Sequence, residues 1–80
     1  MKIYAKMWCP WCKDAFAWLD ARGFDYEKVD VQTDRAAHDR LLAISGQSLT
    51  PTLETDEGKV LADFDTRQLE KFLTEHKIAP

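Results

Sequence analysis

The sequence predicts an α/β fold whose strands and helices follow the order β-α-β-α-β-β-α. Short segments rich in β-branched and aromatic residues alternate with segments whose apolar residues repeat at helical spacing. Glycine or proline marks most of the boundaries between them. The 80 residues contain no repeat, linker or low-complexity stretch, so we expect a single domain spanning residues 1–80.

The first half of the chain predicts a β-α-β unit. The segment Lys2–Lys6 has the short, β-branched and aromatic character of a strand. A helix then begins near Pro10, which suits a first turn because it lacks an N–H, and ends at Gly23. The alternating segment Phe24–Val31 is the second expected strand. Such a unit has parallel strands and a right-handed crossover.

A second helix and a hairpin are expected next. The helix begins at a cap formed by Thr33 or Asp34 and ends at Gly46. Two short strand segments follow, and the turn at Asp56–Gly58 between them predicts a β-hairpin.

The last segment predicts a third helix. Asp65 and Gln68 have the spacing of a capping box at its start. Beyond them runs an apolar stripe with one polar member: Leu69, Phe72, Leu73 and His76. We expect the three helices to cover the sheet.

Composition excludes several function classes. Apolar residues make up 45% and charged residues 31% of the chain, as in folded globular proteins. The net charge of −3 and the absence of a basic stripe argue against a nucleic-acid partner. No apolar run has the length of a membrane span, and no secretory signal is visible. We therefore expect a cytoplasmic protein, and we expect it to be a monomer.

The two cysteines, Cys9 and Cys12, form a C-P-W-C motif where the first strand meets the first helix. Unpaired N–H groups and partial positive charge at a helix N-terminus stabilise a thiolate. Lys6 and Lys13 add nearby positive charge. We expect the pKa of Cys9 to fall from about 8.5 into the range of about 3.5–7.5. Cys9 is then an exposed nucleophile and Cys12, one turn deeper, a resolving thiol.

The C-P-W-C motif has two alternatives to redox chemistry, a zinc site and a permanent disulfide. A zinc site needs a second pair of ligands, and the two histidines lie far along the chain. A permanent disulfide across so small a loop removes little chain entropy. A C-x-x-C pair beside a β-α-β unit is the recognised context of dithiol redox chemistry, which the sequence favours.

Three segments carry a resemblance to the glutaredoxin family: Ile3–Cys12, Ser45–Pro51 and Gly58–Asp65. The resemblance covers essentially the whole chain. It implies a compact thioredoxin-like fold with a four-stranded mixed sheet and three helices. It also implies a cis peptide bond before Pro51, which places the Thr50 backbone opposite the cysteines, where it can bond an incoming thiol-bearing chain.

The resemblance further implies glutathione, or a related low-molecular-weight thiol, as co-substrate, with disulfide-containing proteins as substrates and no tightly bound cofactor or metal. Lys6 stands where glutaredoxins bind the glycyl carboxylate, and Gln47 where many carry a basic or amide residue. Trp11 is the aromatic residue beside the thiols, and Asp65 matches the acidic position near the glutamyl end.

Ala62 and Asp63 depart from the family, in which many members have two glycines here. The glycines let a ligand approach the backbone, and the Asp63 carboxylate would repel an anionic tripeptide. Mycoredoxins and the redoxins that supply electrons to ribonucleotide reductase also lack the pair. The alternative is therefore a redoxin recharged by a flavoprotein of the thioredoxin-reductase type. A third, less favoured reading is an iron–sulfur module held by Cys9 and an external thiol.

Overall fold

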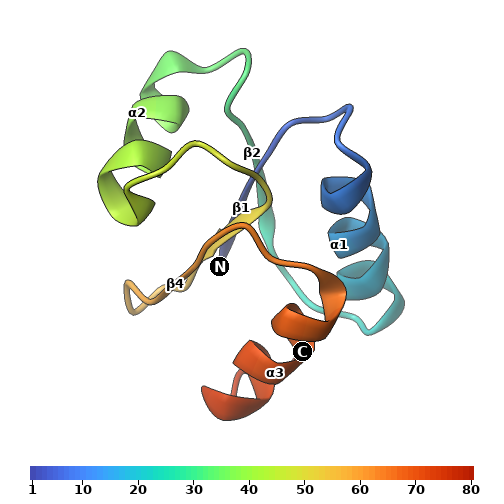
Figure 1. The fold of residues 1–80 in the computed structure, drawn as a ribbon. Helices are drawn as coiled ribbons and strands as arrows, with labels where there is room; N and C mark the ends of the chain where they lie inside the picture. Colours follow the sequence, from blue (N-terminus) through green and yellow to red (C-terminus); the bar gives the residue numbers. More distant parts are fainter.

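The structure, a computed structural model, describes residues 1–80 and has the predicted element order (Figure 1). The elements are β1 (Lys2–Ala5), α1 (Pro10–Ala21), β2 (Glu27–Asp30), α2 (Arg35–Ser45), β3 (Thr52–Glu54), β4 (Val60–Leu61) and α3 (Thr66–Glu75). No helix is long and apolar enough to cross a membrane.

The four strands form one mixed sheet in the order β2-β1-β3-β4. β1 pairs with β2 in parallel and with β3 antiparallel, so that Tyr4 lies between Val29 and Thr52. β3 and β4 form the predicted hairpin. This arrangement confirms the expected mixed sheet.

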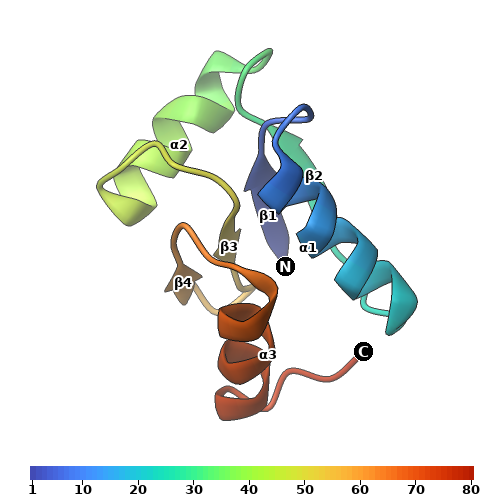
Figure 2. The same ribbon diagram turned by 45° about the vertical axis from the view of Figure 1, so that its right-hand side comes forward.

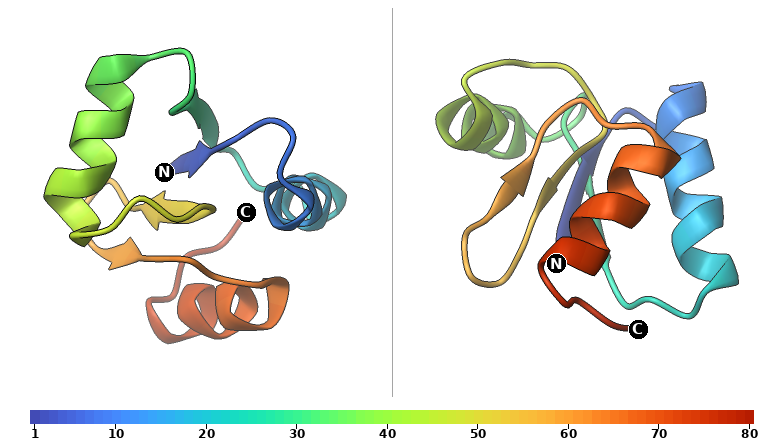
Figure 3. Two further views of the ribbon diagram at one scale, coloured as in Figure 1. Left: turned by 45° about the horizontal axis from the view of Figure 1, so that its top comes forward. Right: turned by 60° about the horizontal axis from the view of Figure 1, so that its bottom comes forward.

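Helices cover both faces of the sheet, with α1 and α3 on one face and α2 on the other (Figures 2 and 3). Because side chains alternate along a strand, β1 serves both layers. Ile3 and Ala5 join the larger core with α1 and α3, whereas Tyr4 joins the smaller core with α2. Leucines anchor the larger core, and burying each fully contributes about 1.5–3 kcal/mol: Leu19, Leu53 and Leu69 are all 0% exposed.

The helix ends follow the sequence signals closely. Asp34, not Thr33, caps α2, and its carboxylate accepts from the Ala37 N–H at 3.2 Å. Gly46 ends the helix with a left-handed φ of 69°. The predicted capping box of α3 is present.

β2 covers only part of the predicted segment Phe24–Val31, so that boundary was wrong. Two aromatic side chains before it stack on α1. The Phe24 and Trp18 ring centroids are 5.9 Å apart, and those of Tyr26 and Phe16 are 5.7 Å apart. Phe24 and Tyr26 therefore pack against α1, although their alternating pattern resembles that of a strand.

The final helix is one residue shorter than its apolar stripe suggests. His76 lies beyond α3 as its C-cap and is exposed, with its ring 4.4 Å from that of Phe72. The other three members of the stripe are buried: Leu69, Phe72 and Leu73.

Candidate active site

Cys9 lies where β1 leads into α1. It is the N-cap residue of the helix, with extended backbone angles (φ −73°, ψ 121°), and Pro10 follows as the first helical residue. Pro10 suits this position because the first helical N–H has no partner within the helix. Cys12 lies in the first turn, and its N–H donates to Cys9 Sγ at 3.4 Å. The motif therefore brings both thiols to the helix N-terminus.

The two cysteines are not joined by a disulfide, and both are buried. Cys9 is 5% exposed and Cys12 is 0% exposed. The expectation of an exposed Cys9 is therefore wrong, although Cys9 is the less deeply buried of the two. The reason is the loop before Pro51, because Cys9 Sγ lies 4.0 Å from the Thr50 carbonyl oxygen, to which it donates.

The two thiols differ in acidity. Burial raises the pKa of Cys9, but hydrogen bonds from the Cys12 thiol, the Cys12 and Trp11 N–H groups and the Thr50 side chain outweigh it and lower the pKa. Burial raises the pKa of Cys12, and the neighbouring Cys9 raises it further. The predicted direction for Cys9 is confirmed. Its cause is local hydrogen bonding, since no lysine is among the groups that lower this pKa most.

The Thr50–Pro51 peptide bond is cis, as the resemblance implied. It turns the chain so that Thr50 faces Cys9 at the start of β3. The Thr50 N–H has no acceptor within the chain. The Thr50 N–H is therefore available for a further hydrogen bond.

Exposed apolar side chains gather around Cys9. The large exposed hydrophobic residues of the whole protein are Met7, Trp8, Trp11, Leu42 and Leu49. Three of them lie within three residues of Cys9, and Leu49 directly precedes Thr50. We name these four residues, Met7, Trp8, Trp11 and Leu49, the apolar rim. Trp8 and Trp11 are its most exposed members, at 63% and 62%.

Lys6 and Trp11 have different neighbours near the motif. Lys6 is half-buried, and its Nζ lies 6.0 Å from the Trp8 ring centroid. Trp11 lines a cavity of about 220 Å³, together with Asp63, Phe64, Asp65 and Gln68. The start of α3 is thus brought beside the aromatic residue of the motif.

Comparison with known proteins shows to which family the chain belongs. A family model described as Glutaredoxin matches residues 1–60. The chain belongs to the glutaredoxin family. A glutaredoxin-like protein in the rubredoxin operon of Clostridium pasteurianum is 29% identical over 91% of this chain and 96% of its own. Mycoredoxin 1 of Corynebacterium glutamicum is 33% identical over 70% of each chain.

A solved structure confirms the thioredoxin-like fold. The thioredoxin-like protein BC3987 superposes with a TM-score of 0.80 at 33% identity, covering 90% of this chain and 97% of that one. The β-α-β-α-β-β-α order and mixed sheet described above are therefore shared along almost the full length of both proteins.

Gln47 differs from what the glutaredoxin resemblance implied. Its Nε2 donates to Ser45 Oγ at 2.8 Å and to Thr52 Oγ1 at 3.2 Å, and its Oε1 accepts from the Leu49 N–H. Both hydrogens of the side-chain amide are therefore used within the loop. The Gln47 side chain therefore ties the loop before Pro51 together and, in this arrangement, has both amide hydrogens bonded within the chain.

The start of α3 is also internally paired in this glutaredoxin. Asp65 Oδ1 accepts from the Gln68 N–H at 2.8 Å, and the Asp65 N–H donates to Gln68 Oε1 at 2.9 Å. Asp63 has a left-handed φ of 51°, a conformation that favours glycine. The Asp65 carboxylate and N–H therefore serve the helix cap.

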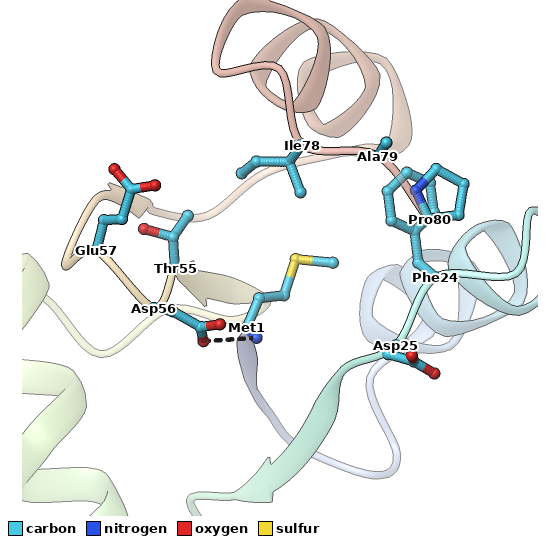
Figure 4. Close-up of a pocket in the computed structure, with 9 residues that line it drawn as sticks. All are labelled: Met1, Phe24, Asp25, Thr55, Asp56, Glu57, Ile78, Ala79 and Pro80. Atoms are coloured by element: carbon cyan, nitrogen blue, oxygen red, sulfur yellow. Dashed lines mark hydrogen bonds and ion pairs between the residues drawn. The ribbon is translucent and has the colours of Figure 1, made fainter.

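A second cavity, of about 300 Å³, lies at the opposite end of β1 from Cys9 (Figure 4). It contains the ion pair between the Met1 ammonium and Asp56 Oδ1, which are 3.0 Å apart. Residues from both ends of the chain line it, together with Phe24, Asp25 and the β3–β4 turn, and none of the predicted site residues does.

Thr52 was not predicted from the sequence to belong to the site. It is 0% exposed and directly follows the cis-proline, and its hydroxyl contacts both Gln47 and the Asp63 N–H. The residue type is only a weak indication of a role in the site, because a threonine between Pro51 and Leu53 also fits an ordinary strand.

Proposed function

We propose that this glutaredoxin is a thiol–disulfide oxidoreductase in which Cys9 is the nucleophile and Cys12 the resolving thiol. The observation that carries the proposal is the N-cap position of Cys9, whose sulfur accepts the Cys12 N–H and faces the Thr50 backbone. An N–H bonded to the sulfur stabilises the thiolate, which is the attacking species.

The reaction has two exchange steps. The Cys9 thiolate attacks one sulfur of a substrate disulfide, the substrate S–S bond breaks, and a mixed disulfide with Cys9 forms while one substrate thiolate leaves. Cys12 then loses its proton and attacks the Cys9 sulfur. The second substrate thiolate departs, the Cys9–Cys12 disulfide forms, and the substrate has gained two electrons.

The proposed reductant of that disulfide is glutathione or a related low-molecular-weight thiol. Family membership supports this choice, as do the cationic Lys6 beside the motif and the cavity between Trp11 and Asp65. The free Thr50 N–H offers a backbone partner for the thiol's own peptide. Two thiol molecules return the pair to the reduced form.

Specific observations favour a second candidate, a redoxin recharged by a flavoprotein of the thioredoxin-reductase type that reduces disulfides in proteins such as ribonucleotide reductase. Gln47 and the start of α3 are committed to internal hydrogen bonds, which reduces the groups available to a tripeptide. The apolar rim offers a surface on which a protein partner would bury area.

A reductant-specificity assay tests both candidates. Turnover of a mixed disulfide with glutathione and glutathione reductase supports the first, and turnover with thioredoxin reductase supports the second. Cys9→Ser should abolish turnover with either reductant. Retention of disulfide reduction by Cys9→Ser would show that the nucleophile is assigned wrongly, and absence of turnover with every reductant would refute the proposed function.

A further inference from the structure

Thr52 has a fully satisfied hydroxyl in the interior of the protein. Its Oγ1 donates to the Leu49 carbonyl oxygen at 3.0 Å, and accepts from Gln47 Nε2 at 3.2 Å and from the Asp63 N–H at 3.4 Å. A hydroxyl has one hydrogen to donate and two lone pairs. All three are used here, in a side chain that is 0% exposed.

The partners of Thr52 belong to the two loops that border the site. Leu49 directly precedes Thr50, whose carbonyl oxygen lies 4.0 Å from Cys9 Sγ. Asp63 belongs to the turn between β4 and α3, which lines the cavity beside Trp11. One oxygen atom thus joins the loop that faces the nucleophile to the turn that borders the neighbouring cavity.

We propose that Thr52 is a positioning residue whose hydroxyl ties the loop before the cis-proline to the turn between β4 and α3, and so holds Thr50 against Cys9. The inference rests on the proposed function, because it assumes Cys9 as the nucleophile. A second link runs from the Phe64 N–H to the Pro51 carbonyl oxygen at 3.2 Å. That link is entirely backbone, which leaves Thr52 as the side chain on which the junction depends.

The substitution Thr52→Val isolates the hydroxyl, because valine has nearly the same shape. It leaves the Leu49 carbonyl, a Gln47 amide hydrogen and the Asp63 N–H without their partner, and buried groups of this kind seek new ones. The loop then relaxes toward water, and Thr50 moves away from Cys9. Thr52→Ser keeps the hydroxyl and loses only a methyl group.

The pH dependence of Cys9 alkylation by iodoacetamide tests the proposal, since it reports the thiolate without requiring a co-substrate. Thr52→Val should raise the pKa of Cys9 by about half a unit or more, the scale of one lost hydrogen bond, because the Thr50 side chain, whose hydrogen bond lowers that pKa, moves away with the loop. It should also lower kcat/KM for disulfide reduction about tenfold, because misplacement of the binding loop weakens catalysis. Thr52→Ser should remain close to the wild type in both.

Thr55→Val is the matched control. Thr55 is another buried threonine, at the far end of β3, and its Oγ1 accepts from the Lys59 N–H at 2.9 Å. This variant should lose stability but keep the Cys9 pKa. If Thr52→Val also leaves that pKa unchanged, or if Thr52→Ser raises it equally, the positioning role is refuted.

A milder variant covers the case in which Thr52→Val fails to fold. Gln47→Met removes one of the three partners and should raise the Cys9 pKa by a smaller amount. An unchanged pKa in folded Gln47→Met would refute the proposal. Failure of the proposed function is a separate result, because wild-type protein without turnover on any disulfide still gives a Cys9 alkylation curve.

Discussion

Cys9 and Cys12 differ in depth and in hydrogen bonding, although two residues separate them. The Cys12 N–H stabilises the Cys9 sulfur at 3.4 Å, whereas Cys12 itself is 0% exposed and has a raised pKa because it is buried. This asymmetry supports the proposed roles, in which Cys9 attacks the substrate and Cys12 carries out the intramolecular step.

Limited alkylation of the reduced protein near neutral pH should therefore label Cys9 first. We expect its rate to exceed that of Cys12 about tenfold or more, because only the thiolate reacts and the pKa of Cys9 is lowered. Tandem mass spectrometry locates the first adduct. Equal labelling of both cysteines would contradict the asymmetry.

We expect the Asp63 carboxylate, which lines the cavity beside Trp11, to oppose an anionic co-substrate. Asp63→Gly removes a carboxylate beside the cavity and relaxes a backbone with a φ of 51°. We expect kcat/KM for glutathione to rise about threefold or more, which is the scale of one charge near a protein surface.

Asp63→Asn separates the two causes, because asparagine removes the charge and still tolerates a positive φ. If kcat/KM for glutathione rises in both variants, the effect is due to the charge. If it rises only in Asp63→Gly, the effect is due to the backbone. If neither variant changes glutathione turnover, Asp63 has no part in the choice of reductant.

The site could be predicted from sequence where its residues are close in the chain. Pro10 and the apolar residues that repeat at helical spacing from Cys12 onward predict a helix N-terminus at the motif. Gln47 could not be assigned in that way, because its side chain turns inward to Ser45 and Thr52. Which way a loop amide points depends on tertiary contacts that a single sequence does not contain.

Among the elements, α3 has the most complete cap. Asp65→Ala removes the carboxylate that accepts the Gln68 N–H, and should lower the free energy of unfolding by about 1 kcal/mol in a urea titration. Because the start of α3 borders the cavity with Trp11, loss of its cap should displace that wall of the cavity and lower disulfide turnover as well.

Asp34→Ala is the matched control for that cap. Asp34 caps α2 through the Ala37 N–H at 3.2 Å, and α2 covers the other face of the sheet. This variant should lose about the same stability, by the usual value of a helix N-cap, with turnover unchanged. Equal turnover in the two variants would show that the start of α3 takes no part in the reaction.

α2 is held to β3 by a charge network. Glu54 is 8% exposed; its Oε1 accepts from the Tyr4 hydroxyl at 2.8 Å, and its Oε2 from Arg40 at 2.7 Å. Burial raises the pKa of Glu54, but the hydrogen bonds from Arg40 and Tyr4 outweigh it and lower the pKa below its ordinary 4.5. The unfolded state therefore takes up this proton first as the pH falls.

It follows that the stability from Glu54 is fully present above its ordinary pKa and is lost as the pH falls through the lowered value. Urea unfolding of the wild type and Glu54→Gln from about pH 6 to about pH 3 measures this. The difference in the free energy of unfolding between the wild type and Glu54→Gln should shrink toward acid pH. A difference that does not depend on pH would contradict the network.

Element order and helix ends could be predicted, because caps and turn residues act locally. Asp34, Gly46 and the box at Asp65 all lie where the sequence placed them. The length of β2 could not be predicted, since Phe24 and Tyr26 stack on α1 instead of extending the strand. Whether these aromatic residues pair in the sheet or stack depends on how α1 packs, which a single sequence does not contain.

For the whole molecule, the topology collects three distant segments at one end of the sheet. The motif after β1, the cis-proline loop before β3 and the turn before α3 all border Cys9 or its neighbour Trp11. The sequence resemblance predicted this gathering. Trp8 and Trp11 could be expected beside the thiols from the sequence, but the exposure of Met7 and Leu49 emerged only from the structure, because exposure depends on how loops fold over the core.

The rim gives a prediction about partners. Trp8→Ala together with Leu49→Ala should reduce turnover of protein disulfides about tenfold while leaving a small-molecule disulfide within about twofold, because only a protein buries this surface. Leu42→Ala, at the exposed leucine outside the rim, is the control. Equal losses on both kinds of substrate would contradict a docking role.

Trapping of the first intermediate tests the central claim most directly. In Cys12→Ser, the second exchange step cannot occur, so intact-protein mass spectrometry after addition of a disulfide substrate should show one mixed disulfide, located on Cys9. Cys9→Ser, treated identically, should show none. A stable adduct on Cys12 in Cys9→Ser, or no adduct on Cys9 in Cys12→Ser, would contradict the assignment of the two thiols.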